Sequence, residues 1–130
     1  MSAVDVVTEY LTSFSFGDPE TIAGFVADGF RNEHLSALGS GTVGREAYLG
    51  RLPDFLGSFT ERAYSIDDVI EHARDAVIDV VVRYRFTATY EDQRIDIPGV
   101  MWFGTRDGKL VSRLDTWDSL TFLRQTGQAD

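Results

Sequence analysis

Apolar residues near the start of the chain recur at the spacing of an α-helix. Four of them lie three or four positions apart: Val4, Val7, Leu11 and Phe14. This spacing places the four side chains on one face and predicts a first helix over residues 4–15. The next segment, Gly17-Asp18-Pro19, combines a helix-ending glycine, an N-cap aspartate and a proline suited to the first helical turn. A second helix is therefore expected over residues 19–29.

The next stretch changes character twice. FRNEHLSAL, residues 30–38, predicts a short extended segment, and the glycine-rich loop SGTVG follows it. A third helix is expected over residues 45–59. Its apolar side consists of Tyr48, Leu52, Phe55, Leu56 and Phe59. Pro53 should kink or restart this helix, because proline cannot donate the helical hydrogen bond.

Beyond Thr60 the apolar residues alternate with polar ones, as they do in β-strands. The predicted strands are residues 63–72, 76–90, 95–104 and 109 onward. Pro98-Gly99 should interrupt the third of these strands early. The longest strand has one apolar face, made of Ile78, Val80, Val82, Tyr84, Phe86, Ala88 and Tyr90. Helices followed by an antiparallel meander predict an α+β fold, with three helices covering one face of a curved sheet.

The last predicted strand carries an unusual row of side chains. Because alternate residues of a strand share a face, Arg113, Asp115 and Trp117 should lie together. A buried charge needs a partner and hydrogen bonds to offset its lost hydration. If this face turns inward, an ion pair beside an aromatic ring lines a small polar pocket. If it turns outward, the pair is merely solvated, and the alternation alone favours neither arrangement.

Composition limits the function classes. The 130 residues, 43% of them hydrophobic, suit one core, so we expect a single domain over residues 1–130 with a frayed tail after about residue 126. The chain has no cysteine, and its two histidines, His34 and His72, lie far apart in sequence. No metal site is therefore expected. The SGTVG loop lacks the lysine of a phosphate-binding loop, and no cofactor is expected.

Charge argues against two kinds of partner. The formal net charge is −9, with 21 acidic and 12 basic residues, so neither nucleic acid nor an anionic membrane is an expected partner. The N-terminal segment lacks the basic stretch of a secretory signal, and no apolar run approaches the length of a membrane span. A cytoplasmic location is the resulting expectation.

Three local features, taken in order, resemble the nuclear transport factor 2-like superfamily and, within it, the SnoaL-like polyketide cyclases. They are the Gly17-Asp18 break, the Gly44-Arg45 start of the third helix and the Asp107-Gly108-Lys109-Leu110 hairpin. The resemblance covers nearly the whole chain. It implies a cone-shaped α+β barrel, in which three N-terminal helices pack on a curved mixed or antiparallel sheet around a central pocket. Such pockets suit small, mostly apolar molecules.

Ketosteroid isomerases, in the same superfamily, offer a register for individual residues. Counting from Gly17-Asp18, Tyr10 is similar in position to their oxyanion-hole tyrosine, and His34 to their carboxylate base. Their second oxyanion donor, an aspartic acid, corresponds to a position on or near Val100. The resemblance therefore does not extend to a complete oxyanion hole, which argues against a steroid isomerase.

Limonene-epoxide hydrolases offer a second comparison. Asp115 matches the strand position of one aspartate of their Asp-Arg-Asp set. Their other two members, an Arg-x-Asp, are met here only by Arg83-Tyr84-Arg85, so that triad is not reproduced. By the same resemblance, the row of Arg113, Asp115 and Trp117 should face the pocket.

The residues so placed suggest acid/base chemistry. His34 or Asp115 would be the general acid/base, Arg113 would pair with Asp115 or bind an oxyanion, and Tyr10 would donate a hydrogen bond to a carbonyl. The expected substrate-binding residues are Trp117, Trp102, Tyr48, Phe55 and Tyr84. Each residue also has a purely structural alternative, as a satisfied histidine, a core tyrosine or a structural ion pair.

These roles predict a cofactor-independent isomerase, cyclase or hydratase acting on an apolar carbonyl compound of the polyketide or steroid type. A non-catalytic ligand-binding protein or a dimeric interaction module is the alternative, since fold alone does not decide function. By resemblance, a homodimer is expected, with the polar face of the long strand pairing two sheets.

Overall fold

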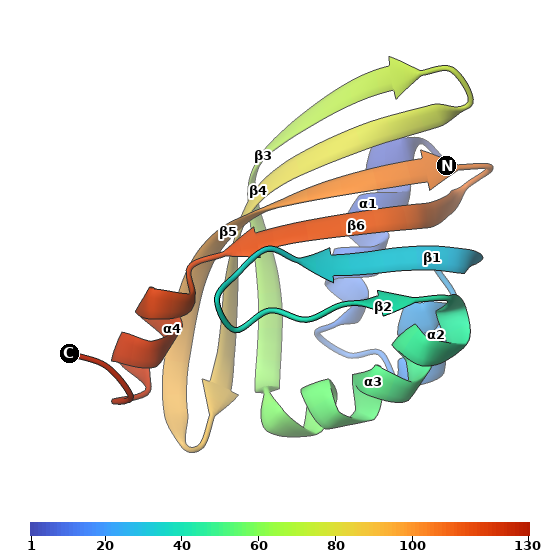
Figure 1. Cartoon of the computed structure of the whole chain (residues 1–130). Helices are drawn as coiled ribbons and strands as arrows, with labels where there is room; N and C mark the ends of the chain where they lie inside the picture. Colours follow the sequence, from blue (N-terminus) through green and yellow to red (C-terminus); the bar gives the residue numbers. More distant parts are fainter.

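The computed structural model describes all 130 residues and is built on one curved, unclosed sheet of six strands in the order β2-β1-β6-β5-β4-β3 (Figure 1). The strands are β1 (Val26–His34), β2 (Thr42–Val43), β3 (Thr60–Arg74), β4 (Val77–Tyr90), β5 (Gln93–Arg106) and β6 (Lys109–Trp117). The helices are α1 (Ala3–Ser13), α2 (Pro19–Ala23), α3 (Arg45–Ser58) and α4 (Ser119–Gln125). The predicted α+β fold, with three N-terminal helices on a curved mixed sheet, is confirmed.

The first two helices begin at side-chain caps. Ser2 and Asp5 form a reciprocal capping box at the start of α1, and Asp18 accepts a hydrogen bond of 2.8 Å from the Thr21 amide at the start of α2. The expected extension of the second helix to residue 29 is wrong, because α2 ends at Ala23. The chain then joins the sheet, where Phe25 O accepts a hydrogen bond from Leu110 N. Pairing with β6 thus overrides the local helical pattern.

Helix α3 is one continuous element. It runs through Pro53 without restarting, and Tyr48 and Leu52 are its buried residues. Gly44 precedes it with φ of 96°, a conformation that favours glycine, and its amide donates to Phe30 O at 2.7 Å. No helix in the structure combines the length and the apolar composition that crossing a membrane requires.

Strands β3 to β6 form the predicted antiparallel meander, and β1 joins its edge by running parallel to β6. The expected interruption of the third predicted strand is wrong, since β5 continues through Pro98, which pairs with Arg85. The C-terminal helix α4 was not anticipated. Asp118 caps it by accepting a 3.0 Å hydrogen bond from the Thr121 amide.

The core lies between the inner face of the sheet and the helices α1 to α3. The inward residues of β4 are those that the alternation indicated, with Val80, Val82, Tyr84, Phe86 and Ala88 buried. Helix α1 adds Val6, Val7, Tyr10 and Leu11. The core does not fill the inner face completely. Toward α3 and α4 the sheet and the helices leave a cavity.

Candidate functional site

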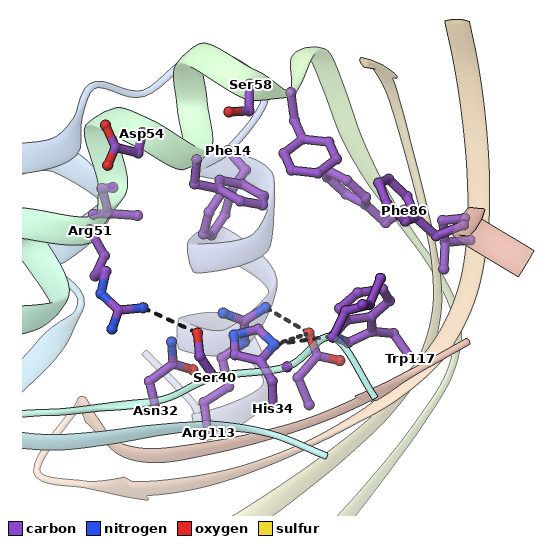
Figure 2. Close-up of a pocket in the computed structure, with 18 of the residues that line it drawn as sticks. Phe14, Asn32, His34, Ser40, Arg51, Asp54, Ser58, Phe86, Arg113 and Trp117 are labelled. Carbon is purple, nitrogen blue, oxygen red and sulfur yellow. Dashed lines mark hydrogen bonds and ion pairs between the residues drawn. The ribbon is translucent and has the colours of Figure 1, made fainter. Parts of the chain in front are cut away.

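A cavity of about 540 Å³ opens between the inner face of the sheet, α3 and the loop that joins β1 to β2 (Figure 2). Most of its wall is apolar. The aromatic and aliphatic members include Phe14, Leu52, Phe55, Phe59, Phe86, Ile95, Ile97 and Phe122. Four of the polar members, Asn32, His34, Arg113 and Asp115, lie on β1 and β6, and the others come from α3, β2 and the β1–β2 loop. A few polar groups in an apolar cavity are typical of a small-molecule site.

Strand β6 presents its polar row inward. Arg113 and Asp115 are only 4% and 3% exposed, and Trp117 lies partly buried beside them at the cavity. Arg113 Nη2 lies 3.1 Å from Asp115 Oδ2. The two alternatives for this face are thereby decided in favour of a lined pocket. The pairing also explains how two charges can be buried on one strand.

Tyrosines surround the Arg113 guanidinium on its other sides. It donates to Tyr10 Oη at 3.4 Å and to Tyr64 Oη at 3.5 Å, and it lies 5.9 Å from the centre of the Tyr10 ring. Its Nε makes no hydrogen bond. The arginine therefore stays charged and held in place below the cavity.

Asp115 is held at both oxygens. Tyr84 Oη donates to Oδ1 at 2.5 Å, and Arg113 donates to Oδ2. Burial raises the pKa of the Asp115 carboxyl, while Arg113 and the Tyr84 hydroxyl oppose that change without cancelling it. Gly99 makes room for this arrangement, since a Cβ there would lie 2.5 Å from Tyr84 Oη. A buried carboxylate with a raised pKa is suited to accept and return a proton.

His34 lies opposite Asp115 in the parallel pairing of β1 with β6. Its Nδ1 accepts a hydrogen bond of 3.3 Å from Trp117 Nε1, so the proton of the neutral ring resides on Nε2. Burial, followed by the charges of Arg113 and Arg51, lowers the pKa of His34 to about 3. Asp115 Oδ2 lies 3.6 Å from the same Nδ1, too far for a hydrogen bond to compete with that of Trp117. His34 is thus a neutral hydrogen-bond donor at pH 7.

Tyr10 lies behind the cavity wall. It is fully buried, and its hydroxyl forms a hydrogen bond with the Tyr48 hydroxyl. Tyr48, on α3, is the member of this pair that lines the cavity. Burial raises the pKa of both hydroxyls, so both stay protonated. Tyr10 thus reaches the cavity through Tyr48 and not directly.

Of the expected substrate-binding residues, Trp117, Tyr48, Phe55 and Tyr84 line the cavity. The placement of Trp102 in the wall is wrong. It is 49% exposed on the outer face of β5, because its neighbours Met101 and Phe103 take the inward positions. Val100 faces outward for the same reason.

The cavity also contains residues that the pattern did not single out. Asn32 precedes His34 by two positions on β1 and shares its inward face. That spacing was the available signal. Arg51, Ser40 and Tyr64 come from α3, the β1–β2 loop and β3, and no local pattern connects them.

The comparison with protein families agrees with this architecture. The sequence model of the SnoaL-like domain family matches residues 7–113 of this chain. The chain belongs to the SnoaL-like domain family. No curated protein sequence matches this SnoaL-like protein significantly.

Solved structures share the fold of this SnoaL-like protein. A hypothetical protein with a ketosteroid isomerase-like fold from Catenulispora acidiphila, in complex with trimethylamine, has a TM-score of 0.83 at 17% identity over 97% of this chain and 95% of that one. An epoxide hydrolase of the LEH-like kind from M. tuberculosis has a TM-score of 0.77 at 18% identity, over 96% and 92%. A protein from Xanthomonas campestris, proposed to be a polyketide cyclase, has a TM-score of 0.69 at 20% identity, over 95% of each chain. These likenesses establish the cone-shaped fold of the SnoaL-like protein.

Proposed function

We propose that this SnoaL-like protein is a cofactor-independent enzyme that moves a proton on an apolar carbonyl compound, by isomerase, cyclase or hydratase chemistry. The observation that supports the proposal is Asp115, a carboxylate buried in the cavity wall between Arg113 and Tyr84. Its raised pKa suits a general base. The apolar walls suit a polyketide-like or steroid-like body.

The proposed step begins with a ketone whose α-carbon lies at Asp115. The carboxylate takes the α-proton, the C–H electron pair forms the enolate C=C bond, and the negative charge moves to the oxygen. His34 Nε2–H donates a hydrogen bond to that oxygen, and Arg113 balances the local charge. Protonated Asp115 then returns the proton to the same carbon or to the distant end of a conjugated enolate. Tyr10 has a supporting role, because it orients Tyr48 and contacts Arg113.

Hydrogen–deuterium exchange tests this proposal without knowledge of the substrate. A panel of cyclic and aromatic ketones is incubated with the protein in deuterated water, and loss of the α-proton signal is followed by NMR. We expect exchange with the wild type and none with Asp115→Asn. Because that variant leaves buried Arg113 without its carboxylate, it should also lose about 3 kcal/mol of stability. Asp115→Glu, which keeps a carboxylate, is the matched control and should retain part of the exchange.

The alternative is a ligand-binding protein that uses the same cavity without turnover. The observation that favours it is that both oxygens of Asp115 already accept hydrogen bonds, as they would in a purely structural ion pair. Tight binding of a ketone with no exchange of its α-protons would support this alternative.

We also propose a homodimer formed by the outer face of the sheet. Ile70, Val81 and Trp102 are cross-strand neighbours on β3, β4 and β5, and Ile70 and Trp102 are both exposed. An exposed apolar row of this kind suits a contact with a second copy. Trp102→Lys should therefore convert a dimer into a monomer in sedimentation experiments. A wild-type monomer mass at every concentration would contradict the proposal.

A further inference from the structure

The cavity is polarised from one side to the other. Figure 2 shows Arg51, Ser40 and Asn32 on one side, and Phe86 and Trp117 on the other. The remaining apolar lining continues the second side with Phe59, Ile95, Ile97 and Phe122. A ligand that fills this space therefore meets hydrogen-bond donors at one end and aromatic or aliphatic surface at the other.

Arg51 supplies a positive charge that the protein leaves without an anion. It extends from α3, and Nη1 donates to Ser40 Oγ at 3.1 Å. It belongs to none of the five ion pairs of the structure. Asp54 also lines the cavity one helical turn away but forms no ion pair with it. The Arg51 charge reaches the polar wall, since it contributes to lowering the pKa of His34.

Asn32 supplies a second polar group at this end of the cavity. The residue is 9% exposed, and its buried Oδ1 has no hydrogen-bond partner. The amide nitrogen donates no hydrogen bond within the protein, and Figure 2 shows it directed toward the open space. Thr42 Oγ1, nearby in the lining, is buried and equally unpartnered. Because Oδ1 is an acceptor buried away from the cavity, the group that Asn32 can offer a ligand is its amide N–H, a donor that suits an acceptor such as a carboxylate.

We propose that Arg51, together with Asn32 and Ser40, binds a carboxylate of the ligand, so that the substrate is an apolar ring-bearing carboxylic acid. The guanidinium matches a carboxylate in geometry and charge, and the Asn32 amide and the Ser40 hydroxyl add neutral donors. The ring then lies against Phe86 and Trp117. Between the two ends, the carbonyl meets His34 and Asp115. The catalytic part of this assignment rests on the function proposed above, while the binding of the carboxylate stands independently.

Three probes with the same ring and different charge test this site by calorimetry. They are 2-naphthylacetate, its uncharged primary amide, and 2-(2-naphthyl)ethylamine, which is a cation at pH 7. The expected order of affinity is acid, then amide, then amine, with about a tenfold difference between acid and amide. Arg51→Gln should weaken binding of the acid about tenfold and binding of the amide much less, so that the difference between them disappears.

Arg83→Gln is the matched control for this experiment. Arg83 is exposed on β4 outside the cavity, and its replacement removes the same charge. It should leave the preference for the acid intact. Asn32→Ala provides a second test. It should weaken the binding of the acid more than the binding of the amine.

Several results would overturn the assignment. They are equal affinity of the wild type for acid and amide, an equal loss of both in Arg51→Gln, tightest binding of the amine, or no binding of any probe at millimolar concentration. Because no turnover is measured, failure here is distinct from failure of the proposed chemistry. Preferred binding of the acid without α-proton exchange on any ketone would keep the carboxylate site and refute the catalytic role.

Discussion

Trp117 Nε1 donates a hydrogen bond to His34 Nδ1 at 3.3 Å, and this contact fixes the tautomer of the histidine. The lone pair that a basic imidazole would use at Nδ1 is occupied. The Nε2–H is left without a partner in the protein, at the surface of the cavity. In the proposed reaction, proton abstraction is therefore assigned to Asp115, and the stabilisation of developing negative charge to His34.

The first prediction concerns the charge of His34. Because its pKa is lowered to about 3, the imidazole should stay neutral from pH 8 down to pH 5. Nitrogen NMR measures this in a His72→Gln background, where His34 is the only histidine left. The protonated nitrogen should be Nε2. Trp117→Phe, which removes the N–H donor, should raise the pKa of His34, and a wild-type His34 that becomes charged near pH 6.5 would refute the assignment.

The second prediction follows from linkage between protonation and folding. His34 has a pKa of about 3 in the folded protein and 6.5 as an ordinary histidine, so between these values the unfolded chain binds more protons. The contribution of His34 to stability is therefore lost as pH falls from 6.5 toward 3, at up to about 1.4 kcal/mol per pH unit. The raised pKa of Asp115 acts in the opposite direction.

His34→Gln separates the two contributions, because it keeps Asp115 and removes the titrating ring. Urea unfolding at a series of pH values gives the free energy of unfolding of both proteins. The difference in this free energy between wild type and variant should become smaller as the pH is lowered. A gap that is constant across the window would mean that His34 is no less basic in the folded protein than in the unfolded chain.

The sequence predicted the β6 row correctly because strand alternation is a local property. Arg113 and Asp115 share a face of the strand regardless of the rest of the chain. The resemblance to the superfamily predicted that this face points inward, and both residues are buried. Asn32 and His34 follow the same rule on β1. The position of β1 next to β6 depends on a parallel pairing between segments that are distant in sequence. No local pattern predicts such a pairing.

The misplacement of Trp102 has a specific cause. An interruption at Pro98-Gly99 would have reset the alternation, so that either face was open to the later residues. In the structure β5 is unbroken, and the inward series that starts at Ile95 and Ile97 continues to Met101. Trp102 consequently points outward. The continuity of β5 through Pro98, which the sequence did not predict, therefore decides the face of Trp102.

The third prediction concerns the hydroxyl of Tyr84. Its hydrogen bond to Oδ1 stabilises the charged form of Asp115, so Tyr84→Phe should raise the pKa of that carboxyl further. The measurement is the pH dependence of the Asp115 carboxyl carbon shift by NMR. If proton exchange is also observed, its acid limb should move to higher pH. Tyr90→Phe is the control, because that residue lines the cavity and has no hydrogen bond to Asp115. An identical titration in Tyr84→Phe and wild type would contradict the role of the hydroxyl.

The last prediction tests whether Gly99 is required for this geometry. In Gly99→Ala the new methyl would lie 2.5 Å from Tyr84 Oη and 2.8 Å from the Thr116 carbonyl oxygen, so the tyrosine must leave its position. Overpacking of this kind typically costs about 1–3 kcal/mol, and loss of the hydrogen bond to Asp115 adds to it. Gly57→Ala is the control, since nothing lies within 4 Å of that Cβ on α3 and alanine favours helix by about 1 kcal/mol. Urea unfolding should show opposite changes in the two variants. If Gly99→Ala were as stable as wild type and kept its Asp115 titration, the Tyr84 hydroxyl would not depend on the space that glycine leaves.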